Sequence, residues 1–156
     1  MSYQVSLFKE PLREQEHHIA GAHQILLVDD DPNILMFVAL TLEDQGYHVA
    51  KASSAESAIQ TLSKRDFDLV ITDLDLPGAS GITVLKTAKA LNPETMVMIL
   101  TGNYDFEFAL ESSRVAADEY LLKPCTAEEL YLGVGKCLER LQGKRTNEQS
   151  EAQIRA

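Results

Sequence analysis

The sequence predicts an α/β domain built on a doubly wound parallel sheet with helices on both faces. Short apolar runs alternate along the chain with segments in which apolar residues recur at helical spacing. Several of the runs are almost continuously apolar, as in strands that helices cover on both sides. Strands and helices that alternate in this way form a parallel sheet. A chain of 156 residues, 45% of them hydrophobic, is long enough for one such domain.

Each element follows from its own local pattern. Five apolar runs are the expected strands, at residues 24–29, 47–51, 68–73, 95–101 and 119–122. Helical spacing predicts helices that end near residues 46 and 64, helices over 81–91 and 105–114, and a last helix that begins near residue 126. The last helix carries an apolar stripe made of Leu130, Val134, Cys137, Leu138 and Leu141.

Two helix starts carry a capping box, in which a hydroxyl and an acid three residues later satisfy each other's backbone N–H groups. Ser53 with Glu56 predicts the start of the helix that ends near residue 64. Thr126 with Glu129 predicts the start of the last helix.

Polar residues stand at the strand ends, where a doubly wound sheet binds its ligands. They are Asp29, Asp30, Asp73, Thr101 and Lys123. Carboxylates on adjacent strand ends should meet in one pocket, and two charges about 4 Å apart repel by roughly 4 kcal/mol at an effective dielectric near 20. A hard divalent cation outweighs that repulsion. The sequence therefore predicts a Mg²⁺ site there.

Asp31 is expected to have a different role from its two acidic neighbours. It precedes Pro32, and an aspartate followed by proline at the first helical position is typical of a helix N-cap. We therefore expect Asp31 to cap the next helix and not to bind the ion.

The remaining polar residues suit phosphoryl transfer. Asp73 can act as the nucleophile, because aspartyl phosphates are established covalent intermediates. Lys123 and the cation can stabilise the transferred phosphoryl oxygens. Thr101 offers a hydroxyl donor to one of them.

The polar residues at the strand ends, in this order, resemble those of the receiver domain of two-component response regulators: Asp29-Asp30, Asp73, Thr101 and Lys123-Pro124. The resemblance covers about residues 23–142. It implies a flavodoxin-like sheet with strand order 2-1-3-4-5. It also implies a signalling switch that accepts a phosphoryl group on Asp73 from a histidine kinase or phosphotransfer protein. Such a protein catalyses its own phosphorylation and slow dephosphorylation and is not a conventional enzyme.

The resemblance also implies the details of the site. Mg²⁺, or Mn²⁺ in its place, would be held by Asp30, Asp73, the backbone carbonyl of Asp75, and Asp29 largely through water. The peptide bond between Lys123 and Pro124 would be cis.

Thr101 and Tyr120 match the family's switch pair, in which the hydroxyl moves toward the phosphoryl group and the aromatic ring turns inward behind it. Two departures stand out. Cys125 replaces the phenylalanine usual after Lys-Pro. Glu128 and Gly133 replace the paired arginines of the largest DNA-binding subfamily. The usual salt-bridged dimer is therefore not expected, although a phosphorylation-dependent homodimer stays open.

Charge and composition limit which partners and which cellular location can be expected. A net charge of -10 argues against direct binding of nucleic acid. No apolar run is long enough for a membrane span, no signal peptide is recognised, and the two cysteines lack metal-ligand spacing. We expect a cytoplasmic protein.

Polar segments flank the receiver region. Residues 1–22 form a polar extension, and residues 143–156 form a polar tail or the start of a linker. The chain after Leu141 is too short for an output domain. The protein is therefore either a stand-alone receiver that acts on a downstream protein or the first part of a longer regulator.

Two alternatives remain open at this stage. Residues 70–75 resemble the Asp-x-Asp nucleophile motif of haloacid-dehalogenase-type phosphatases, although the acidic pair here precedes that strand and no cap domain is recognised. The second alternative is a receiver-like binding module that signals without phosphorylation.

Overall fold

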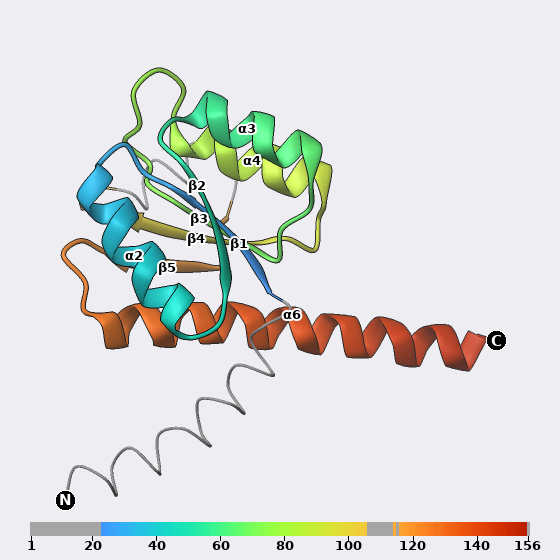
Figure 1. The fold of residues 1–156 in the computed structure, drawn as a ribbon. Helices are drawn as coiled ribbons and strands as arrows, with labels where there is room; N and C mark the ends of the chain where they lie inside the picture. Colours follow the sequence, from blue (N-terminus) through green and yellow to red (C-terminus); the bar gives the residue numbers. More distant parts are fainter. Residues whose placement is uncertain (1–22, 106–113, 115, 156) are drawn as a thin grey trace, which may run out of the picture.

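The computed structural model describes residues 23–105, 114 and 116–155 and contains a five-stranded parallel sheet (Figure 1). The strands lie in the order β2-β1-β3-β4-β5, which confirms the predicted fold class and strand order. Their bounds are Gln24–Val28 for β1, His48–Ala52 for β2, Leu69–Thr72 for β3, Met96–Thr101 for β4 and Glu119–Leu122 for β5. Because β1 pairs with both β2 and β3, the chain changes direction across the sheet beside β1.

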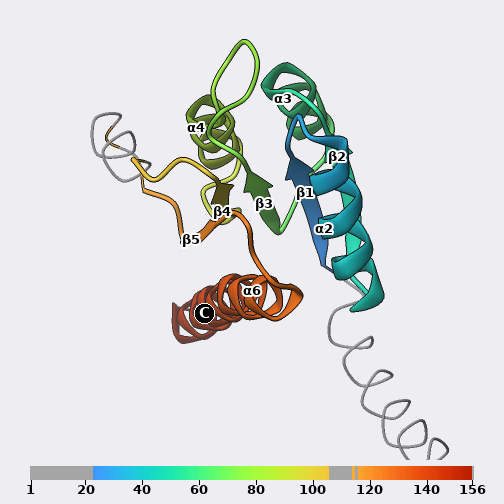
Figure 2. The ribbon, with the colours of Figure 1, turned by 90° about the vertical axis from the view of Figure 1, so that its left-hand side faces the viewer.

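The helices cover both faces of the sheet (Figure 2). Their bounds are Pro32–Asp44 for α2, Ala55–Lys64 for α3, Gly81–Leu91 for α4 and Ala127–Arg155 for α6. Helices α3 and α4 pack on one face, and α2 and α6 pack on the other. The helix expected over 105–114 lies almost entirely outside the described residues.

Strand β1 contributes side chains to the core on both faces of the sheet. Successive side chains of a strand point to opposite faces. Leu26 and Val28 accordingly pack with α3 and α4, while Ile25 and Leu27 pack with α2 and α6. All four residues are buried, which explains why the strand is a continuous apolar run.

Two of the predicted helix caps are confirmed. The Asp31 side chain accepts a hydrogen bond from Asn33 N at 2.9 Å, and Pro32 opens α2. At the start of α6, Glu129 N donates to Thr126 Oγ1 at 3.1 Å, and Thr126 N donates to Glu129 Oε1 at 3.2 Å. Both helices therefore begin where local chemistry predicts.

The capping box predicted at Ser53 and Glu56 is wrong. The N-cap of α3 is Ser54, whose Oγ accepts from Ser57 N at 3.1 Å. The Glu56 carboxylate instead accepts from Ala79 N, in the loop between β3 and α4, at 3.3 Å. The start of the helix at Ala55 allows this fully buried alanine to pack in the core, and tertiary packing thereby selects the second of two adjacent serines.

Helix α6 continues beyond Leu141 through the segment for which a polar tail or linker was expected. It is one helix of 29 residues, and its last part runs past the sheet (Figure 1). Within the described part of the chain, no helix has both the length and the apolar character needed to cross a bilayer.

Candidate functional site

The polar residues predicted at the strand ends meet at the carboxyl edge of the sheet. Asp29 follows β1, Asp73 follows β3, Thr101 ends β4 and Lys123 follows β5. The hydrogen-bonding ladder extends to these positions: Asp73 N donates to Val28 O at 3.0 Å, and Lys123 N donates to Thr101 O at 2.9 Å. Parallel pairing thus brings together side chains from four separate parts of the sequence.

Lys123 joins two buried carboxylates. Its Nζ lies 2.5 Å from Asp29 Oδ2 and 2.7 Å from Asp73 Oδ2. Burial favours the neutral form of Lys123, but the hydrogen bonds from its ammonium to Asp29 and Asp73 outweigh this and raise its pKa. The ammonium therefore partly offsets the repulsion between the acids.

The pKa of Asp29 is raised because burial penalises its charged form. Hydrogen bonds from Lys123 and from Asp31 N oppose this effect, the second at 2.9 Å. Only 2% of the Asp29 side chain is exposed.

The Asp73 carboxylate is held by donors from several segments. Its Oδ1 accepts from Thr101 Oγ1 at 2.7 Å and from Asp75 N at 3.1 Å, and its Oδ2 accepts from Lys123. Thr101 is itself buried, and its Oγ1 accepts from Asn103 N at 3.2 Å. The orientation of the carboxylate is therefore fixed on both oxygens.

Three carboxylates form the candidate cation site. One oxygen from each of Asp29, Asp30 and Asp73 lies within 4.8 Å of the others. Asp29 and Asp73 are buried and Asp30 is exposed, so the cluster reaches solvent on the side of Asp30. An all-oxygen donor set fits Mg²⁺, which prefers carboxylates together with water and phosphate oxygens. The side chain of Asp75 is exposed, and a metal contact from its backbone carbonyl stays a prediction.

The other residues singled out in the sequence lie on β5 or just after it. Tyr120 is on this edge strand with 38% of its surface exposed. The peptide bond between Lys123 and Pro124 is cis. Cys125 is half-buried, and burial raises the pKa of its thiol. A smaller fraction of the thiol is therefore in the reactive thiolate form.

The role of one residue beside the site was not predicted from the sequence. The buried Thr72 hydroxyl donates to the backbone carbonyl of Asp73 at 2.9 Å. The only signal for it was a hydroxyl at the end of the apolar run Leu69–Thr72.

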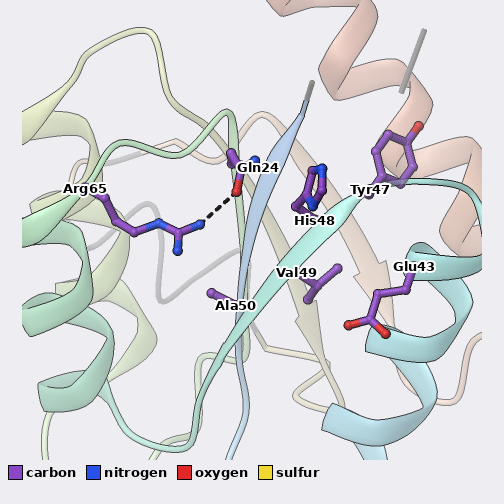
Figure 3. Close-up of a pocket in the computed structure, with 7 residues that line it drawn as sticks. All are labelled: Gln24, Glu43, Tyr47, His48, Val49, Ala50 and Arg65. Atoms are coloured by element: carbon purple, nitrogen blue, oxygen red, sulfur yellow. Dashed lines mark hydrogen bonds between the residues drawn. The ribbon is translucent and has the colours of Figure 1, made fainter. Parts of the chain in front are cut away.

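A cavity of about 350 Å³ lies at the other end of the sheet (Figure 3). Its lining residues are Gln24, Glu43, Tyr47, His48, Val49, Ala50 and Arg65. Two of these residues are joined by a hydrogen bond, which Arg65 donates to Gln24 Oε1 at 2.8 Å (Figure 3). The cavity contains none of the residues predicted for the site, so the carboxyl edge carries the candidate chemistry.

Comparison with known proteins agrees with this geometry. The family model described as the response regulator receiver domain matches residues 25–134. The alginate biosynthesis transcriptional regulatory protein AlgB of Pseudomonas aeruginosa is 40% identical over 116 residues, which are 74% of this chain and 26% of AlgB. The transcriptional regulatory protein ZraR of Escherichia coli K12 is 37% identical over 114 residues, which are 73% of this chain and 26% of ZraR. The chain thus spans about a quarter of the length of these relatives.

Solved structures share the fold over most of the chain. A CheY-like receiver domain protein from Methanospirillum hungatei has a TM-score of 0.74 at 30% identity, covering 78% of this chain and 98% of that one. NtrX from Brucella abortus has a TM-score of 0.75 at 32% identity, covering 81% of this chain and 29% of NtrX. TrrA from Thermotoga maritima, solved in complex with Mg²⁺ and BeF, has a TM-score of 0.67 at 33% identity, covering 74% of this chain and 98% of TrrA. The chain therefore belongs to the family of response regulator receiver domains.

Proposed function

We propose that this receiver domain is switched by transfer of a phosphoryl group to Asp73. The supporting observation is that Thr101 and Lys123 each contact one oxygen of the Asp73 carboxylate, both at 2.7 Å. Those donors come from β4 and from the end of β5, the region whose surface would change on phosphorylation. Neither a phosphatase nor a non-phosphorylated binding module receives support from the relatives.

In the proposed reaction an oxygen of Asp73 attacks the phosphorus of a phosphohistidine or an acyl phosphate. The new O–P bond forms as the bond to the donor breaks, and the leaving group takes its electron pair. Lys123 lies where its ammonium can neutralise charge on the transferred group. Thr101 would exchange its hydrogen bond to Asp73 for one to a phosphoryl oxygen, and Tyr120 would turn inward behind it.

A divalent cation would bind beside Asp73. Asp30, Asp73 and the backbone carbonyl of Asp75 would hold Mg²⁺, with Asp29 acting largely through water and Mn²⁺ as an alternative ion. The cluster of three carboxylates supports this proposal, as does the presence of Mg²⁺ in the similar TrrA structure. The bound ion would supply positive charge to the transferred phosphoryl oxygens.

The phosphoryl donor would be a histidine kinase or phosphotransfer protein in the cytoplasm. Output would pass to a downstream protein or to a further domain, because the similar regulators are several times longer than the matched segment. The net charge of -10 argues against direct binding of nucleic acid by this chain. Phosphorylation would also be the step that promotes any homodimer.

The test is to incubate the protein with acetyl phosphate and Mg²⁺ and to measure its intact mass. One phosphoryl group should be added per chain, and Asp73→Asn should abolish the addition. Asp66→Asn is the matched control, because it makes the same change at an exposed carboxylate outside the site and should leave labelling at the wild-type level. Labelling of Asp73→Asn at the wild-type level would contradict the assignment.

The time course separates the alternatives. A switch gives stoichiometric labelling that decays slowly after the donor is removed. Steady turnover of a phosphate monoester would indicate a phosphatase, and the absence of any Mg²⁺-dependent labelling would indicate a binding module.

A further inference from the structure

The main chain around Asp73 is held as firmly as its carboxylate. Asp73 N donates to Val28 O on β1, and its carbonyl oxygen accepts from the Thr72 hydroxyl. The next carbonyl, that of Leu74, accepts from Gly81 N at 3.0 Å. The two peptide units that flank Asp73 and the next one along the chain are therefore each bound by a separate group.

Gly81, the first residue of α4, lies directly against this main chain. A Cβ atom on Gly81 would lie 1.8 Å from the carbonyl oxygen of Asp73, 2.7 Å from its carbonyl carbon and 2.9 Å from Leu74 Cα. Non-bonded carbon atoms normally approach to about 3.5–4.0 Å. All three neighbours are main-chain atoms, so no side chain can rotate away, and the helix and the strand end would have to separate by more than about 1 Å.

Space, and not backbone conformation, makes glycine necessary at this position. Gly78, three residues earlier, has a φ of +76°, which itself favours glycine. Gly81 has no positive φ, so another residue could adopt its backbone angles. A Cβ on Gly135, within α6, would meet nothing within 4 Å, so alanine there adds a methyl group without a steric clash.

We infer that Gly81 is a positioning residue for phosphoryl transfer. Its lack of a side chain lets α4 close on the main chain of Asp73 and so keeps the carboxylate at its distances from Thr101 and Lys123. This inference rests on the proposed role of Asp73. Thr101 and Lys123 belong to β4 and to the end of β5 and are not attached to α4, so a displacement of Asp73 changes both distances at once.

The test compares Gly81→Ala with the matched variant Gly135→Ala. Both are labelled with acetyl phosphate and Mg²⁺ at a temperature at which circular dichroism shows each to be folded. The maximal labelling rate of Gly81→Ala should fall about 10- to 100-fold, because a misplacement near 1 Å costs up to that factor. Gly135→Ala should label at the wild-type rate. A folded Gly81→Ala protein that also labels at the wild-type rate would overturn the inference.

A second variant covers the case in which Gly81→Ala does not fold. Thr72→Val keeps the side-chain shape and removes the hydroxyl that binds the same Asp73 carbonyl. Its labelling rate should fall about fivefold, the factor that corresponds to the free energy of one lost hydrogen bond. An unchanged rate would show that labelling does not depend on how the Asp73 main chain is held, and this would overturn the inference for Gly81. Failure of the wild-type protein to label would instead overturn the proposed function itself, and this inference with it.

Discussion

Asp30 and Asp31 are adjacent in the sequence but have different environments. Asp30 shares a cluster with Asp29 and Asp73, whereas the Asp31 side chain binds the backbone of α2. The change from strand end to helix start between these residues turns the two side chains to different partners. One acidic run thus supplies residues to both the candidate cation site and a helix cap.

This difference in environment predicts that alanine substitutions of Asp30 and Asp31 affect different properties of the protein. Asp30→Ala should lower Mg²⁺ affinity by more than about tenfold, because it removes a proposed direct ligand of the ion. Asp31→Ala should leave Mg²⁺ affinity unchanged and lower the free energy of unfolding by about 1 kcal/mol through loss of the cap. Isothermal titration calorimetry and urea denaturation measure the two quantities. Equal losses of Mg²⁺ affinity would refute the division of roles.

Lys123 should matter for stability as well as for chemistry. Lys123→Met leaves Asp29 and Asp73 buried without their shared cation, so without Mg²⁺ the free energy of unfolding should fall by about 2 kcal/mol. Added Mg²⁺ should raise the melting temperature of this variant more than that of the wild type, because the ion replaces the missing charge. Lys136→Met, at an exposed position on α6, is the control. Melting curves in EDTA and in Mg²⁺ that matched the wild type would show that Lys123 does not balance the acids.

At the scale of the element, α3 shows how packing chooses among local signals. Ser53 and Ser54 are both suitable caps by sequence, and only Ser54 binds the N–H of Ser57. Glu56 is then free to reach the loop between β3 and α4, where it binds Ala79 N. The helix start thus also helps to order the loop that carries Asp75.

Substitution of each serine tests this choice. Ser54→Ala should lower the free energy of unfolding by about 1 kcal/mol, the usual effect of losing an N-cap. Ser53→Ala should change it by less than about 0.5 kcal/mol, as expected at an exposed position. Urea denaturation of the two variants decides between them, and the opposite ranking would restore the cap at Ser53.

At the scale of the whole molecule, Asp68 links α6 to the start of the described chain. Arg145, beyond the last apolar contact of α6, lies 2.8 Å from Asp68 Oδ1, just before β3. Asp68 Oδ2 accepts from Gln24 N at 2.7 Å, and His23 Nδ1 lies 3.8 Å away. Burial opposes ionisation of Asp68, but the nearby His23 and the hydrogen bonds from Gln24 N and Arg145 outweigh this effect and hold its pKa at about 2.

This pKa predicts a pH-dependent share of stability. The folded pKa of Asp68 lies below the ordinary aspartate value of 3.8, so its contribution to stability is nearly complete above about pH 4 and is lost as the pH falls toward 2. The shift corresponds to about 2 kcal/mol. Asp68→Asn should therefore melt below the wild type at pH 7, by several degrees, and the difference should shrink between pH 4 and pH 2. Asp66→Asn, at an exposed position, is the control. A difference that stayed constant over this range would show that the charge of Asp68 is not responsible.

The sequence by itself determined the features that depend on neighbouring residues. Apolar runs predicted the strands, Asp31-Pro32 and Thr126 with Glu129 predicted two helix starts, and polar residues at strand ends predicted the edge that holds the site. These signals are local, because a strand or a cap is fixed by residues within a few positions of each other. Chain topology then brings the strand ends together, which is why the ordered polar residues also indicated the family.

Only the tertiary structure decided the features that depend on residues far apart in the chain. The bridge from Lys123 to Asp29 spans 94 positions, the bond from Arg145 to Asp68 spans 77, and the bond from Ala79 to Glu56 spans 23. Hydrophobic periodicity and capping rules compare residues only a few positions apart, so they cannot predict such contacts. The position of Gly81 against Asp73 is of the same kind, because it depends on where a helix meets a strand end in space. The sequence thus predicted which polar residues meet at the candidate site, and packing between distant elements decided how they are held.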